Sequence, residues 1–100
     1  MEGFIPTGER LREKRKAENT TQFTLAIEMG LMPQMISAIE TGINFPLHGD
    51  AAEKIAAYLE MDFTEYQHIT RISKIIASAE KLGLKVSIDD VEKILSPEVK

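Results

Sequence analysis

Cysteine and tryptophan are absent from this chain of 100 residues, and the first absence removes several kinds of chemistry. Without cysteine there can be no disulfide, no thiolate metal ligand and no thiol nucleophile, a composition that fits the reducing cytoplasm. Its two histidines, His48 and His68, have no clustered ligating partners, so we expect no metal site. The chain also has no apolar run long enough to cross a bilayer and no basic-then-apolar leader, so we expect no membrane segment.

Residues with the chemistry of an active site are equally scarce. Asp89 and Asp90 are adjacent carboxylates, but acidic residues are common at the start of a helix. No glycine-rich loop of the kind that holds phosphates is present, and neither histidine is near a nucleophile in a recognisable pattern. We therefore expect a protein without catalytic activity and without a cofactor.

Positive charge is missing from the middle of the chain. The formal net charge is −4, and residues 21–53 contain neither lysine nor arginine but carry Glu28, Glu40, Asp50 and Glu53. Residues 1–20 hold five lysines and arginines against four glutamates. Because binding to nucleic acid depends largely on neutralising phosphates, any such surface must draw its positive charge from the first 20 residues or from the C-terminal third.

What the chain does contain is apolar residues at helical spacing, with 43% apolar and 28% charged residues overall, as in ordinary globular proteins. We expect an all-α fold. Thr7 is the predicted N-cap of a first helix, His48 or Asp50 starts a fourth, and Asp62 caps a long fifth helix that ends at Gly83.

The segment 21–42 predicts two short helices joined by a tight turn at Gly30, where positive φ and close approach are needed. Thr21 is the expected cap of the first, and Pro33 fits the first position of the second. The predicted inner face of the two helices comprises Phe23, Ala26, Ile27, Leu31, Ile36 and Ile39. This pattern is a helix-turn-helix, with the outer face of the second helix left open to a partner.

In these residues the chain resembles the phage-repressor-like helix-turn-helix domains (Cro/cI-type, XRE). The resemblance covers about residues 5–66 and rests on an ordered set of matches. These are Thr21-Gln22, Ala26, Gly30-Leu31, Ile36-Ser37, Ile39-Glu40 and Gly42, with the flanking segments GERLREKRKAEN and IAAYLEMDFTEY. It implies a five-helix domain that binds double-stranded DNA, which we place at residues 1–66.

The resemblance also implies which residues meet DNA. In the family, the outward positions of the second motif helix enter the major groove. In this chain they are Pro33, Gln34, Met35, Ser37, Ala38 and Thr41. Gln34 has the amide that pairs with adenine, while Met35 and Ala38 suit a thymine methyl. An ordinary solvated helix surface is the alternative for the same residues.

Other family positions supply phosphate contacts and one ion pair. Gln22, next to Thr21, matches the phosphate-contacting glutamine, and Asn44 is placed to reach the DNA backbone beyond the second helix. Arg15 and Glu40 match a partly buried ion pair that ties the first helix to the recognition element. Arg10, like the neighbouring cations of the first helix, suits either a phosphate contact or a solvated helix face.

Residues 67–100 read as a C-terminal extension for dimerisation. The apolar stripe of the fifth helix is longer than the small domain needs, and a last helix starts at Asp89-Asp90. Between them, residues 84–88 alternate as in a short strand, which either pairs with its equivalent in a second copy or is an extended connector. The residues expected at a subunit interface are Ile72, Ile76, Ala79, Leu82 and Val86.

The predicted function is therefore a sequence-specific, DNA-binding transcriptional regulator, a homodimeric repressor of phage, plasmid or bacterial type. The alternative is a protein-interaction module, such as an antirepressor or adaptor, in which Met35, Ile43 and Phe45 bind another regulatory protein. The acidic, cation-free motif favours this alternative, and the family resemblance favours DNA.

Overall fold

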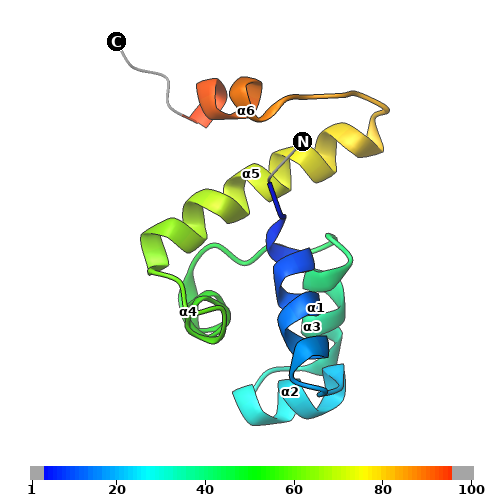
Figure 1. Ribbon diagram of the computed structural model, residues 1–100, viewed down its shortest axis with the longest axis vertical. Helices are drawn as coiled ribbons and strands as arrows, with labels where there is room; N and C mark the ends of the chain where they lie inside the picture. The colour runs from blue at the N-terminus through cyan, green and yellow to red at the C-terminus, as the bar shows by residue number, and fades with distance from the viewer. Residues whose placement is uncertain (1–3, 96–100) are drawn as a thin grey trace.

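The computed structural model describes residues 4–95, and the side chains of residues 4–92. Over this range the chain forms six helices and no strand, so the all-α prediction is confirmed (Figure 1). The helices are α1 (Thr7–Ala17), α2 (Gln22–Met29), α3 (Pro33–Glu40), α4 (Gly49–Tyr58), α5 (Phe63–Lys81) and α6 (Ile88–Leu95). None of the described helices has both the length and the apolar character needed to cross a bilayer.

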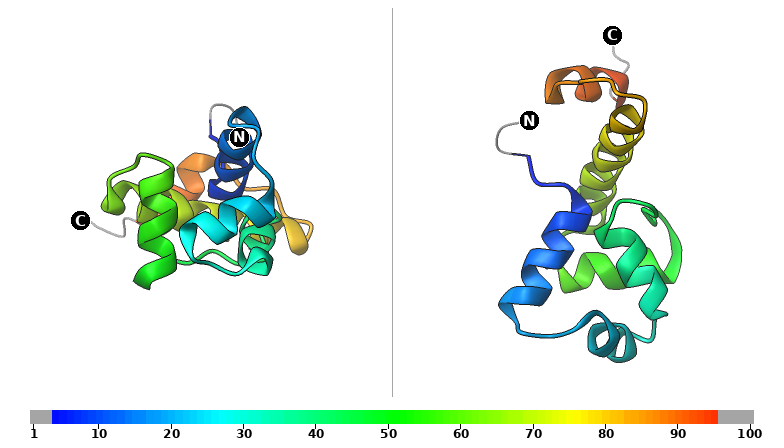
Figure 2. Two further views of the ribbon diagram at one scale, coloured as in Figure 1. Left: turned by 90° about the horizontal axis from the view of Figure 1, so that it is seen from below. Right: turned by 90° about the vertical axis from the view of Figure 1, so that its right-hand side faces the viewer.

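The helices are arranged along a long axis of 43 Å, with α2 at one end, α6 at the other and α5 crossing between them (Figures 1 and 2). Local signals explain the turn between α2 and α3. The Thr21 side chain accepts a hydrogen bond from the N–H of Thr24, Gly30 adopts φ 71°, and Pro33 begins α3. Gly42, at φ 81°, follows the end of α3 as predicted.

The start of α1 differs from the prediction. Thr7 is the first residue of the helix and not its cap, because its polar groups are used in a contact with α5. Its N–H donates to Ser73 Oγ at 2.9 Å, and its hydroxyl shares a 2.9 Å hydrogen bond with that of Thr70. All three side chains are buried. Since buried polar groups need partners, this cluster fixes the start of α1 on α5.

A first hydrophobic cluster joins α1 to α4 and the beginning of α5. Its buried members are Leu11, Leu25, Ala26, Ile36, Ile39, Ala52, Ile55, Ala56 and Tyr66. The expected burial of Phe23 and Ile27 is wrong, since these side chains are 63% and 60% exposed. Because α2 has apolar residues on two faces, spacing alone did not select the inner one, and Leu25 with Ala26 fills that place.

A second cluster lies on the C-terminal half of α5, where α6 covers it. Ile72, Ile76 and Val91 are its buried members, with Phe4, Ile75, Val86 and Ile88 packed around them. Of the two alternatives for residues 84–88, a strand and an extended connector, the structure has the connector. Residues 84–87 are an irregular connection, and Ser87 caps α6 by accepting a hydrogen bond from the N–H of Asp90 at 3.1 Å.

This packing corrects the expected subunit interface. Ile72, Ile76 and Ala79 are only 2%, 7% and 7% exposed within one chain, and Val86 packs against the same cluster. Leu82, in contrast, is 74% exposed. The surplus apolar stripe of α5 is therefore covered by this chain's own C-terminal segment, and the division we placed between residues 66 and 67 lies inside a continuous helix.

Candidate nucleic-acid interface

Glu40, the last residue of α3, is the centre of a hydrogen-bond network that joins three helices. Arg15 of α1 donates from Nε to Glu40 Oε2 at 2.7 Å and from Nη2 to Glu40 Oε1 at 3.0 Å. Gln22, the first residue of α2, donates from Nε2 to Glu40 Oε1 at 3.0 Å. Arg15 also donates from Nη1 to the carbonyl of Thr20 at 2.9 Å. The network therefore holds the end of α3 against the beginning of α2.

Burial makes this network sensitive to the charge on Glu40. The side chains of Arg15 and Glu40 are 12% and 3% exposed. Burial by itself raises the pKa of Glu40, but the hydrogen bonds from Arg15 and Gln22 outweigh it and hold that pKa below its usual value. The hydrogen bond to Glu40 raises the pKa of Arg15 in turn, against the effect of burial. Both groups are therefore charged at neutral pH.

Beside the network, a shallow surface hollow of about 610 Å³ opens at the N-terminus of α2. It is lined by Arg15, Lys16, Asn19, Thr20, Thr21, Gln22 and Phe23. The N–H groups of Gln22 and Phe23 precede the first hydrogen bond within α2, and the positive end of a helix dipole favours an anion. Lys16 is exposed at this hollow. The exposed lysine and the free N–H groups at this hollow are the groups that bind a phosphate.

The outward residues of α3 differ in their exposure. Gln34 is exposed, whereas Pro33, Ser37 and Ala38 are half-buried, and Met35 packs partly against the first cluster. Asn44 is exposed just beyond the helix. Thr41 is exposed, but its hydroxyl donates to the carbonyl of Ser37 at 2.9 Å.

Arg10 lies away from the hollow at the start of α2, so the structure does not bring it together with Lys16 and Gln22. Its Nε donates to the carbonyl of Ile5 at 2.6 Å, and it shares a second hollow with Leu59 and Met61 at the end of α4. Arg15 follows Arg10 by five positions in α1, which places the two side chains roughly 140° apart around the helix. Lys14 also belongs to this other side, where its Nζ lies 3.4 Å from Glu60 Oε2.

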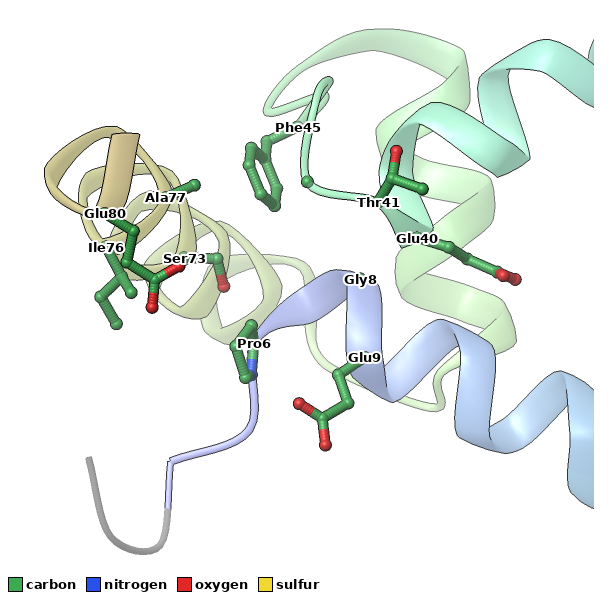
Figure 3. Close-up of a pocket in the computed structure, with 11 residues that line it drawn as sticks. Pro6, Gly8, Glu9, Glu40, Thr41, Phe45, Ser73, Ile76, Ala77 and Glu80 are labelled. Atoms are coloured by element: carbon green, nitrogen blue, oxygen red, sulfur yellow. The ribbon is translucent and has the colours of Figure 1, made fainter. Parts of the chain in front are cut away.

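Figure 3 shows a cavity of about 210 Å³ where α1, the end of α3 and α5 meet. Phe45 and Glu9 lie on opposite sides of it, and the carboxylate of Glu40 points away from it. Gly8 makes the close approach of α1 to α3 possible, because a Cβ at this position would lie 2.2 Å from the carbonyl oxygen of Ile39. The cavity therefore lies beside the close contact between α1 and the end of α3 that Gly8 allows.

Two features of this end of the molecule go beyond the sequence prediction. One is that Lys16 lies at the hollow, since the sequence grouped it with the other cations of the first helix as either a phosphate contact or part of a solvated face. The other is the exposure of Phe23, Ile27 and Met32, at 63%, 60% and 62%, on α2 and the turn that follows it. The spacing of Phe23 and Ile27 by four residues did indicate one shared face, but not that this face is turned to solvent.

Comparisons with protein-family models, curated proteins and solved structures give no match to this chain.

Proposed function

We propose that this chain is a sequence-specific regulator that binds double-stranded DNA, with α3 in the major groove and a phosphate in the hollow at the start of α2. The observation that carries the proposal is the network of Arg15, Gln22 and Glu40. It fixes the recognition helix and the phosphate-binding hollow relative to each other, which a reader of base edges requires. The resemblance to phage-repressor-like domains supports the same reading.

Charge is supplied by one strip of α1 and not by the helix-turn-helix itself. Lys16 lines the hollow, and Arg12 lies close enough to Glu40 to lower its pKa. With so few cations, only a few phosphates are neutralised per chain, so binding weakens with salt by a slope of about 0.9 per phosphate contact in a double-logarithmic plot. Specific base contacts from Gln34 then add discrimination worth about 1–3 kcal/mol.

A homodimer fits this mechanism, because two copies can read successive major grooves about one duplex turn apart. Leu82 and Leu84 are 74% and 56% exposed at the far end of α5, and they are the apolar side chains available there for a contact between copies. Bound across a promoter, such a dimer acts as a repressor by occlusion. Sedimentation of the free protein and of the complex measures the number of chains.

Fluorescence anisotropy with a pooled random duplex, across a salt series and with recovery of the bound sequences, tests the proposal. We expect saturable, salt-sensitive binding that enriches a pseudo-palindrome. Lys16→Ala should weaken binding to every duplex and make the salt slope less steep. The matched control is Lys81→Ala, at an exposed lysine at the end of α5, which should change neither. Absence of binding at low salt would refute the proposal.

A second candidate is a protein-interaction module. It is favoured by the three exposed apolar residues Phe23, Ile27 and Met32 beside a motif without lysine or arginine. Of the surface expected from sequence, Ile43 is 73% exposed as predicted, whereas Phe45 is only 8% exposed and Met35 is half-buried. Binding to a protein through apolar contacts should respond little to salt, which separates the two candidates.

A further inference from the structure

The outer face of α2 and the turn after it carry an apolar surface that the chain itself does not cover. We call it the α2 patch, formed by Phe23, Ile27 and Met32, each at least 60% exposed. It lies at the end of the molecule opposite α6 (Figures 1 and 2). Single exposed apolar residues are ordinary, but three large ones on a helix of eight residues and its adjoining turn indicate a contact surface.

The α2 patch is continuous with the proposed phosphate site. Phe23 belongs to both, since it also lines the hollow with Arg15 and Lys16. A ligand that covers Phe23 and Ile27 therefore extends directly over a positively charged hollow at the positive end of the α2 dipole. Apolar side chains such as Phe23 and Ile27 do not bind DNA phosphates, so this part of the surface suits a ligand with apolar groups of its own.

Charges at the two ends of α2 indicate the character of that ligand. Arg15 and Lys16 stand at its beginning, and Lys54 Nζ lies near Gly30 at its end, 3.2 Å from where a Cβ on that glycine would be. Lys54 also pairs with Asp50 at 2.9 Å. Glu28 follows Ile27 but is about 140° around the helix from Phe23. Arg15 is paired with Glu40 and Lys54 with Asp50, so the exposed Lys16 at the beginning of α2 is the cation that favours acidic residues in a partner.

We propose that the α2 patch docks an amphipathic helix of a regulatory protein, with apolar residues on Phe23, Ile27 and Met32 and carboxylates over the Arg15–Lys16 hollow. Such a helix occupies the phosphate position and displaces DNA. This regulation rests on the proposed function, whereas the docking itself does not. Grooves and faces that bind amphipathic helices use anchors at helical spacing in the same way.

Two synthetic helical peptides with an identical leucine stripe test the docking, one flanked by glutamates and one by lysines, each labelled for fluorescence anisotropy in the absence of DNA. The glutamate peptide should bind the wild-type chain saturably and at least about tenfold more tightly than the lysine peptide. Ile27→Ser and Lys16→Ala should each weaken it by about tenfold, as expected of central anchors. No saturable binding of the glutamate peptide at about 1 mM, the limit of weak recognition, would overturn the proposal.

Matched controls remove an apolar residue and a cation away from the α2 patch. Ile5→Ser and Lys81→Ala, both at exposed positions, should bind the glutamate peptide as the wild type does. Since Ile27 is exposed, its variant should melt at the wild-type temperature in circular dichroism. Equal binding of both peptides, or unchanged binding by a correctly folded Ile27→Ser chain, would also overturn the docking.

Competition then tests the regulatory part. If the recovered operator duplex binds, the glutamate peptide should displace it with a midpoint that follows peptide affinity, and joint binding of both ligands would overturn the overlap. If no duplex binds, the proposed function fails while the peptide measurements still decide the docking. The two failures are therefore distinguishable.

Discussion

Arg15 and Glu40 lie 25 residues apart in sequence, yet their side chains form a bidentate ion pair, with Nε 2.7 Å from Oε2 and Nη2 3.0 Å from Oε1. The same carboxylate accepts from Gln22, so one buried group determines how α1, α2 and α3 meet. A pair of this kind contributes less through its own attraction than through the cost of leaving one member alone.

Arg15→Ala should destabilise the fold by about 3 kcal/mol, because it leaves the carboxylate of Glu40, 3% exposed, without its cation. Urea unfolding followed by circular dichroism measures this. Lys14→Ala is the control, since Glu18 and Glu60, its partners, are 48% and 80% exposed, and its loss should destabilise the fold much less. Equal losses in both variants would show that the Arg15 pair has no special role.

The ion pair should also make stability depend on pH in the acid range. Because the folded pKa of Glu40 is lowered, its contribution is complete above the unfolded value of about 4.3 and is lost as pH falls through the folded pKa. Glu40→Gln should therefore be less stable than wild type at pH 7, and its deficit should be smaller at pH 3. Thermal melts at both pH values test this. An equal deficit at both would mean that the charge of Glu40 is not the cause.

Gly8→Ala should destabilise the chain by about 1–3 kcal/mol, because the added Cβ would meet the carbonyl oxygen of Ile39 and push α1 away from the end of α3. The neighbouring Glu9→Ala, at an exposed position in the same helical turn, should change stability by no more than about 1 kcal/mol. Unfolding in urea compares them. A Gly8→Ala chain more stable than the wild type would show that α1 and the end of α3 are not closely packed at this position.

Val91→Asp should detach α6 without unfolding the helix-turn-helix, because Val91 is fully buried in the second cluster while the core of α1 to α4 forms the first. A carboxylate cannot remain there unpaired. Amide hydrogen exchange should become faster in α6 and the second half of α5 and stay unchanged in α2 and α3. Lys85→Asp, at an exposed position, should change neither. Uniformly faster exchange would mean that the two clusters unfold together.

Gln34→Ala should reduce affinity for the selected operator by about 1–3 kcal/mol while binding to random duplex stays the same, since Gln34 is exposed on α3 and suited to adenine. Anisotropy titrations with both duplexes measure the ratio. Asn44→Ala provides a comparison at an exposed residue placed to reach the backbone, where losses should be similar on both duplexes. A matching loss on both duplexes for Gln34→Ala would show that it reads no base.

Sequence spacing predicted the fold where one local signal had one structural solution. Thr21, Gly30, Pro33 and Gly42 each occupy the cap or turn position expected of them, because these positions depend on backbone geometry near the residue itself. The identity of the buried face of α2 was not predictable in this way. Phe23, Leu25, Ala26 and Ile27 are all apolar, so only the packing of α1 and α3 could choose among them.

The same difference separates what was determined by sequence alone from what was decided by tertiary structure. The sequence by itself determined an all-helical chain, two short helices joined by a turn within residues 21–42 and a middle segment without lysine or arginine, since these follow from local propensity and composition. Only the tertiary structure decided that α6 covers Ile72 and Ile76, that Lys16 stands at the start of α2 and that the α2 patch faces solvent. Those outcomes depend on which helix surfaces pack against each other. That packing brings together residues far apart in the chain, so local sequence does not determine it.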